Sequence, residues 1–128
     1  MKKTYCVLGG GGSFGLHTSK YLLDHADPAQ VVAVGRNPPK LNSFTMGVGD
    51  GDPRYSYHAI HVTYELDLLM ELLDKVQPQV IINYAAQGEG AASWKKSWRF
   101  FETNSMALAR LVEELQSRKY MERFIQIG

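Results

Sequence analysis

The sequence predicts an α/β fold with a doubly wound parallel sheet, and three observations lead to this prediction. Short runs of apolar residues, several of them β-branched, alternate along the chain with longer segments of helical period. The runs are apolar at consecutive positions, which is typical of strands that helices cover on both faces. A run of glycines stands directly between the first apolar run and the first helical segment. The predicted order is therefore strand, helix, strand, loop, strand, helix, strand, helix, strand.

Five strands and three helices account for this order. The strands are predicted at residues 5–8, 31–34, 57–62, 80–82 and 123–127. The helices are predicted from apolar residues at helical spacing, over residues 13–25, 65–76 and 97–118. In the first helix, Ser13 is the expected N-cap, and its apolar faces are expected to carry Phe14, Tyr21 and Leu22. Right-handed crossovers then arrange the elements as a Rossmann-like sheet.

Residues 36–56 break the alternation and predict a long loop. Pro38 and Pro39 disfavour helical geometry in the residues that precede them. Glycines recur through the second half of the segment, which further opposes regular structure.

The composition excludes several classes of protein. The chain of 128 residues has a net charge of +1, so neither a nucleic acid nor a membrane surface is expected as a partner. The single Cys6 excludes an intramolecular disulfide scaffold, and the histidines lack metal-ligand spacing, so no metal is predicted. No apolar run is long enough to span a membrane, and the start of the chain is a poor signal peptide. We therefore expect a cytoplasmic protein.

The strongest motif is the glycine run after the first predicted strand. Gly10, Gly12 and Gly15 fit the pattern G-x-G-x-x-G, while Gly9, Gly12 and Gly15 fit G-x-x-G-x-x-G. A helix N-terminus at this place offers unpaired N–H groups to an anion, and glycines let the backbone approach a diphosphate. The motif therefore predicts a dinucleotide site, and the alternative is a tight turn without a ligand. A Walker phosphate loop is excluded because no Lys-Ser or Lys-Thr pair follows.

The end of the second predicted strand indicates which dinucleotide binds. Sites that prefer NAD usually place an acidic residue here to bond the ribose hydroxyls, whereas this chain has Gly35, Arg36 and Asn37. A guanidinium can pair with a 2′-phosphate in forked geometry, and an acid would repel that phosphate. NADP is therefore the predicted cofactor, with NAD as the alternative and a solvated Arg36 as the simpler interpretation.

Together with further segments, these motifs resemble the extended short-chain dehydrogenase/reductase family. The nucleotide-sugar epimerase and dehydratase branch is the most similar, especially its GDP-mannose 4,6-dehydratase type. The further segments are His17, residues 76–87 with Ala85-Ala86-Gln87 at their end, Phe101-Glu102-Thr103-Asn104, and residues 123–128. They follow one another in the order typical of the family and cover essentially the whole chain.

The resemblance implies a role for each matching position. The implied cofactor contacts are Gly9, Gly12, Ser13, Phe14, Gly15, Arg36, Asn37, Val62, Ala85, Ala86 and Asn104. A structural hydrogen bond is the alternative for Asn104. Residues 87–93, from Gln87 to Ser93, are implied to begin the loop that faces the substrate. His61 departs from the family, which usually has an Asp here that contacts the adenine amino group.

The resemblance also implies a catalytic tyrosine followed by a lysine four residues later. None of the seven tyrosines has this partner, so no catalytic residue is assigned. Residues 1–128 are expected to be the N-terminal portion of an NAD(P)-binding Rossmann domain, truncated before the later strands and the substrate domain. The full enzyme would act on a nucleotide sugar; the alternative is a non-catalytic dinucleotide-binding or partner-binding module. Apolar residues near the end, at 124–127, predict a homo-oligomer.

Overall fold

The computed structural model describes residues 2–36, 47–85 and 105–127. Its strands are β1 (Thr4–Leu8), β2 (Gln30–Gly35), β3 (Tyr55–Ala59), β4 (Val80–Asn83) and β5 (Arg123–Gln126). Its helices are α1 (Ser13–His25), α2 (Leu66–Val76) and α5 (Ala107–Leu115). Each of these elements lies at a place where the apolar pattern predicts one, and each has the predicted type.

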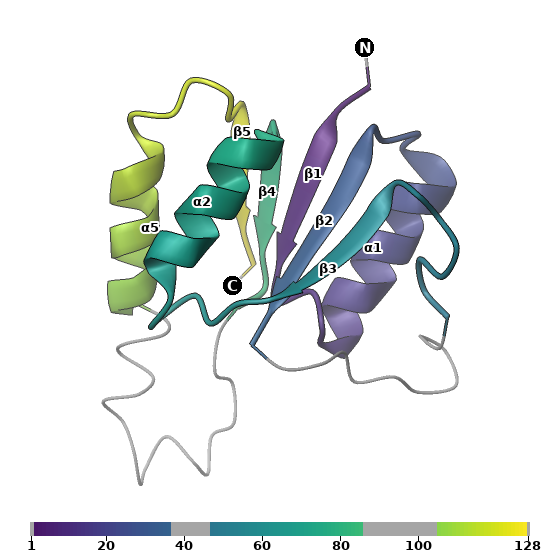
Figure 1. The fold of residues 1–128 in the computed structure, drawn as a ribbon, viewed down its shortest axis with the longest axis horizontal. Helices are drawn as coiled ribbons and strands as arrows, with labels where there is room; N and C mark the ends of the chain where they lie inside the picture. The colour runs from purple at the N-terminus through teal and green to yellow at the C-terminus, as the bar shows by residue number, and fades with distance from the viewer. Residues whose placement is uncertain (1, 37–46, 86–104, 128) are drawn as a thin grey trace, which may run out of the picture.

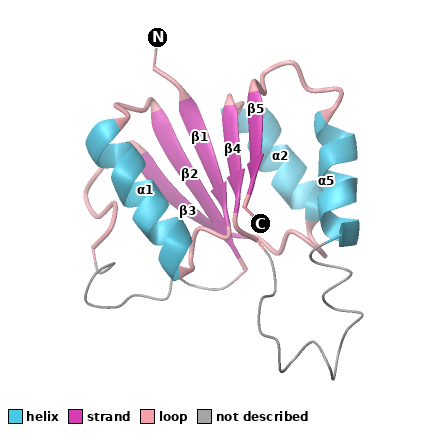
Figure 2. Cartoon of the chain, turned by 180° about the vertical axis from the view of Figure 1, so that it is seen from behind, coloured by secondary structure: helices cyan, strands magenta, loops and turns pink. Residues whose placement is uncertain are grey.

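The strands pair in parallel to form one sheet with the order β3-β2-β1-β4-β5. Helix α1 covers one face of this sheet, and α2 and α5 cover the other (Figure 1, Figure 2). The predicted doubly wound, Rossmann-like architecture is therefore confirmed. The chain runs outward from β1 through β2 to β3, and then returns to place β4 on the other side of β1. Such a reversal opens a crevice at the carboxyl ends of the two central strands, where ligands bind in sheets of this kind.

Alternating side chains of the strands divide the core into two layers. On one face, Cys6 and Val32 pack with the buried residues of α2 and α5. On the other face, Val7 and Val31 pack with Leu22 of α1. The buried residues of α2 are Leu66, Leu69, Met70 and Leu73, which share one face of the helix. Burial raises the pKa of the Cys6 thiol to about 12, so Cys6 is a protonated core residue.

The predictions for the first helix need two corrections. The N-cap of α1 is Gly12 rather than Ser13, and no side chain caps the helix. Phe14 and Tyr21 do not face the core, because their side chains are 78% and 64% exposed. They lie seven residues apart on one side of the helix, whereas the sheet is contacted by the opposite side. The buried residues of α1 are Gly15, Leu16, Ser19, Leu22 and Leu23.

The ends of the other strands and of α2 differ from the predictions by at most one residue, while β3 and α5 differ by more. Strand β3 spans Tyr55–Ala59, so it starts two residues before the predicted range of 57–62, and residues 60–62 lie beyond its end. Helix α5 ends at Leu115, three residues before the predicted end at residue 118. The predicted helical residues 97–104 lie outside the described residues. Of the predicted loop, residues 47–54 form turns, while Tyr55 and Ser56 belong to β3.

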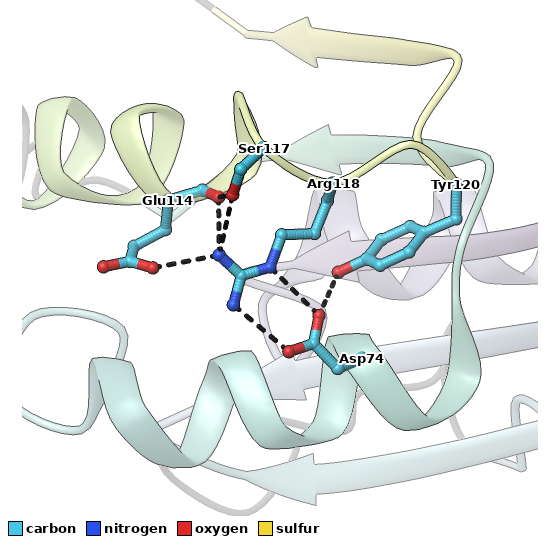
Figure 3. Close-up of polar contacts among 5 residues, drawn as sticks. All are labelled: Asp74, Glu114, Ser117, Arg118 and Tyr120. Carbon is cyan, nitrogen blue, oxygen red and sulfur yellow. Dashed lines mark hydrogen bonds and ion pairs between the residues drawn. The ribbon is translucent and has the colours of Figure 1, made fainter.

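An ionic cluster closes the amino end of the sheet, where α2 ends and the chain enters β5 (Figure 3). Arg118 donates two hydrogen bonds to Asp74, from Nε to Oδ1 and from Nη2 to Oδ2, each 3.2 Å long. Its Nη1 donates to the backbone oxygen of Glu114 at 2.8 Å and to Ser117 Oγ at 3.2 Å. Tyr120 Oη also donates to Asp74 Oδ1, at 2.8 Å. The cluster therefore fastens α2 to the segment that leads into β5.

Strand β5 is an edge strand, and it leaves apolar side chains partly uncovered. Ile125 is 37% exposed, and Ile127, just beyond the strand, is 42% exposed. Among the residues that the structure describes, no helix is long and apolar enough to cross a membrane.

Candidate functional site

The glycine run forms the turn from β1 into α1, and its members meet different constraints. Gly9 has a φ of +75°, which favours glycine, and a Cβ on it would lie 2.9 Å from the Ala85 nitrogen. A Cβ on Gly15 would overlap the Gly9 oxygen and lie 2.7 Å from the Gly10 Cα. Gly12 differs, because the nearest atom to a Cβ there would be the Gly9 oxygen at 3.7 Å. The fold therefore needs glycine at positions 9 and 15, but it leaves the space beside Gly12 open.

The first turn of α1 has backbone N–H groups without acceptors. The Gly12 N–H donates to the Gly9 oxygen at 3.3 Å, and the Leu16 N–H donates to the Gly12 oxygen at 2.9 Å. Within the described ranges, the intervening N–H groups of Ser13, Phe14 and Gly15 have no acceptor. The first turn also contains no acidic residue. Three donors at the positive end of a helix dipole are suited to hold an anion.

The residues after β4 lie against the glycine turn, and Asn83 holds them in place through hydrogen bonds. Asn83 is only 3% exposed; its Nδ2 donates to Gln126 Oε1 at 2.8 Å, and its Oδ1 accepts the Ala85 N–H at 2.9 Å. The Tyr84 N–H donates to the Leu8 oxygen at 2.8 Å, and the Tyr84 hydroxyl bonds Thr18 Oγ1 at 2.6 Å. These bonds hold the start of the β4 loop against the glycine turn. The sequence analysis assigned no role to Asn83, although a polar residue that ends an apolar strand was the available signal.

The end of β2 brings three residues to the same edge. Arg36 follows the strand with an exposed side chain, and it forms no ion pair with any part of the chain that the structure describes. Gly35 lies beside the glycine turn, since a Cβ on it would be 3.3 Å from the Gly11 nitrogen. The hydroxyl of Tyr57, from the neighbouring strand β3, lies against both Gly35 and Gly11. The sequence analysis did not identify Tyr57 as a site residue.

After β3, His61 shapes the turn into α2. Its Nδ1 accepts the Thr63 N–H at 3.2 Å, so the ring proton is carried by Nε2. Its own N–H donates to Glu65 Oε1 at 2.8 Å, and its carbonyl accepts the Glu65 N–H at 2.7 Å. Val62 packs, partly buried, against the core layer of α2 and α5. The imidazole thus supplies the turn acceptor that an aspartate side chain often provides.

The structure brings part of the predicted site together. Gly9, Gly12, Ser13, Phe14 and Gly15 form one turn, with Ala85 against it. Arg36 and Val62 follow the neighbouring strands β2 and β3. The remaining predicted positions, which are Asn37, Ala86, Gln87, Ser93 and Asn104, lie outside the described residues.

Comparisons with known proteins agree on the fold. The model of the NAD dependent epimerase/dehydratase family matches residues 5–128. No curated protein sequence matches the chain. A dTDP-glucose 4,6-dehydratase from Bacillus anthracis, solved in complex with NAD, is 20% identical, with a TM-score of 0.78 over 98% of this chain and 37% of that chain.

Two further solved structures are similar. UDP-glucuronic acid 4-epimerase from Bacillus cereus, in complex with UDP-glucuronic acid and NAD, is 23% identical, with a TM-score of 0.77 over 98% of this chain and 40% of that chain. The UDP-Glc/GlcNAc 4-epimerase from Campylobacter jejuni is 16% identical, with a TM-score of 0.81 over 97% of this chain and 36% of that chain. At these identities the likeness shows the fold, and the chain spans well under half the length of each enzyme.

Proposed function

The chain belongs to the NAD dependent epimerase/dehydratase family, and from this premise we propose that it binds a nicotinamide dinucleotide, NADP in preference to NAD. The site is the crevice at the carboxyl ends of β1, β2 and β4. Its diphosphate is held by the three N–H groups of the first turn of α1, which have no acceptor in the described part of the chain. Ala85, which lies against Gly9, borders the same crevice.

The observation that carries this proposal is the open space at Gly12. Its backbone is extended, with φ −80° and ψ 171°, which any residue adopts, and a Cβ there would meet nothing closer than 3.7 Å. Neither conformation nor packing within the described chain therefore requires glycine at this position. Close approach of a diphosphate to the backbone does require it. The neighbouring glycines, in contrast, are explained by the fold alone.

The preference for NADP rests on the end of β2. Gly35 stands where an acidic residue would bond the ribose hydroxyls of NAD. Arg36 follows directly, exposed and without an ion-pair partner in the described ranges. A guanidinium in this place binds a 2′-phosphate by two parallel hydrogen bonds and favours its charge.

The proposed role of the dinucleotide is in the conversion of a nucleotide sugar. The three structural neighbours described above are nucleotide-sugar dehydratases or epimerases, and two of them were solved with NAD. A bound nicotinamide supplies a hydride acceptor or donor, while the residues of this chain bind and orient it. Asn37, Ala86 and Asn104 remain proposed cofactor contacts, and Gln87 and Ser93 remain proposed contacts on the substrate side.

Isothermal titration calorimetry with NADP and with NAD tests the proposal. Wild type is expected to bind both, NADP more tightly, whereas Gly12→Val is expected to abolish binding because its side chain fills the place of the diphosphate. The valine fits the extended backbone, so the free energy of unfolding should change by less than about 1 kcal/mol. A folded Gly12→Val that binds as tightly as wild type would contradict the assignment of the site.

Arg36→Ala tests the preference separately. Loss of a charge-assisted hydrogen-bond pair is expected to weaken NADP binding by about tenfold or more, and to leave NAD binding nearly unchanged. Equal weakening of both dinucleotides would refute the pairing of Arg36 with the 2′-phosphate. Since Arg36 is exposed, the thermal unfolding of the Arg36→Ala variant should match that of wild type.

A further inference from the structure

The hydroxyl of Tyr57 occupies a special place at the edge of the proposed cofactor site. Tyr57 pairs in register with Ala33 of β2, and its side chain extends along the sheet toward the carboxyl end of that strand. A Cβ built on Gly35 would overlap the Tyr57 hydroxyl oxygen. A Cβ built on Gly11 would lie 2.5 Å from the same oxygen. One hydroxyl therefore fills the space that a side chain on either glycine would need.

This arrangement explains why position 35 carries no side chain. In a dinucleotide-binding sheet, the residue at the end of the second strand is the one whose carboxylate bonds the ribose hydroxyls. Here the first carbon of any such acid would overlap the Tyr57 hydroxyl, so an acid at position 35 would require the tyrosine side chain to move from its observed place. The polar group beside position 35 is therefore the Tyr57 hydroxyl of β3, and not a side chain of β2.

We propose that Tyr57 is a specificity-determining residue of the cofactor site: its hydroxyl replaces the acid of β2 and donates a hydrogen bond to the 2′-phosphate of NADP, beside Arg36. This inference rests on the proposed function, because it names the group that meets the ribose at that same site. The phenol differs from a carboxylate in carrying no negative charge at neutral pH and in having a proton to donate. It therefore accepts a phosphate that an acid would repel, and it fills the space in which an acid would have to stand.

Burial is consistent with a neutral donor. Tyr57 is partly buried between β3 and the glycine turn, and desolvation raises the pKa of its phenol. The hydroxyl is therefore protonated at neutral pH, where the cofactor phosphate is ionised. Arg36, one residue beyond Gly35, supplies the positive charge that the phenol lacks.

Tyr57→Phe tests the hydrogen bond, because it removes the hydroxyl and keeps the ring. Calorimetry is expected to show NADP affinity lowered by about five- to tenfold and NAD affinity lowered by less than about threefold, with thermal unfolding near that of wild type. Unchanged affinity for NADP in Tyr57→Phe would overturn the proposal. An equal loss for both dinucleotides would also overturn it, because the hydroxyl would then not distinguish the 2′-phosphate.

Substitutions at positions 35 and 57 test the steric overlap through thermal stability, without a ligand. Gly35→Asp alone is expected to lower the thermal unfolding temperature, because its Cβ meets the Tyr57 hydroxyl, and Gly35→Asp with Tyr57→Ala is expected to recover part of that loss. The double variant should also prefer NAD to NADP. If Gly35→Asp is as stable as wild type, the claim that the Tyr57 hydroxyl fills the space of an acid at position 35 is wrong, whichever dinucleotide the protein binds.

The two experiments separate the failure of this inference from failure of the proposed function. Wild type that binds neither dinucleotide would end the proposed function, and with it the role of Tyr57 toward a ligand. Wild type that binds NADP, with Tyr57→Phe binding it equally well, would remove the Tyr57 inference alone.

Discussion

The two ends of the sheet use their polar groups in opposite ways. At the amino end, Arg118 directs all three of its nitrogens to acceptors in Asp74, Glu114 and Ser117 (Figure 3). Arg54, just before β3, likewise bonds Asp52 and the Leu23 oxygen at the end of α1. At the carboxyl end, three N–H groups of α1 and the guanidinium of Arg36 have no such partners within the described residues.

We interpret this difference as one between polar groups that stabilise the fold and groups that are paired only by the proposed ligand. A polar group that the protein pairs with itself stabilises the fold and needs nothing further. The N–H groups of the first turn of α1 lie beside Gly12, which the fold does not require to be glycine. On our proposal, these donors gain their acceptors when the dinucleotide binds. We therefore expect substitutions at the amino end to change stability alone, and substitutions at the carboxyl end to change binding.

The largest expected effect comes from Gly15, which the fold requires and whose N–H is one of the three proposed donors to the ligand. Gly15→Val should lower the free energy of unfolding by about 3 kcal/mol, because its Cβ overlaps the backbone of the turn and α1 must move off β1. Urea unfolding measures this loss, and Gly12→Val, with little loss, is the matched control. Equal stability of the two variants would show that Gly12 and Gly15 do not differ as the structure indicates.

At the amino end, Asp74→Ala should reduce stability and spare binding. It removes the acceptor of Arg118 and Tyr120, but the carboxylate side chain is 47% exposed and solvent screens the pair, so we expect a loss of about 1 kcal/mol. Urea unfolding and calorimetry with NADP measure the two properties on the same sample. Weaker NADP binding by the folded variant would contradict the expectation that substitutions at the amino end change stability alone.

The amino end should also set part of the acid stability. Hydrogen bonds from the Arg54 side chain lower the pKa of Asp52 from 3.8 to about 2. Because the folded pKa is the lower one, the stabilisation by Asp52 is complete above pH 3.8 and is lost as the pH falls toward 2. The urea midpoints of wild type and Asp52→Asn should therefore differ at pH 6 and converge as the pH approaches 2. A difference that stays constant with pH would show that Asp52 gains nothing from its charge.

The smallest expected effect concerns Ser19, whose hydroxyl has no partner among the described residues and is not part of the proposed site. Ser19 lies on the buried side of α1, and its Oγ has no hydrogen bond within the described structure. Ser19→Ala should raise the free energy of unfolding by about 0.5–1 kcal/mol, because alanine removes an unpaired hydroxyl and favours the helix. NADP binding should be unchanged. A loss of stability on urea unfolding would reveal a partner for the hydroxyl.

The sequence predicts the sheet and helices well, because apolar runs and helical periods depend on burial, which the pattern records directly. The range of α1 matches the structure at both ends, yet the same pattern places Phe14 and Tyr21 on apolar faces, although both are exposed. Large size and hydrophobicity do not by themselves select the buried face; the position of the sheet does. The start of β3 at Tyr55 is set by pairing with Val31, which the local sequence does not contain.

The candidate site could be predicted only where one segment carries it. The glycine motif lies in a single turn, so its spacing is visible in the chain. Tyr57 and Asn83 act through residues distant in sequence, since Tyr57 lies against Gly11 and Gly35, and Asn83 bonds Gln126. Such contacts depend on which strands are neighbours and in what register, and this information comes from the folded sheet.

The most direct test of the account is to follow the backbone amide signals of the protein by NMR during titration with NADP. The account predicts the largest shifts at Ser13, Phe14 and Gly15, with a further shift at Arg36, and little change at Asp74 or elsewhere at the amino end. Unmoved signals in the first turn of α1, at concentrations where calorimetry detects binding, would contradict it.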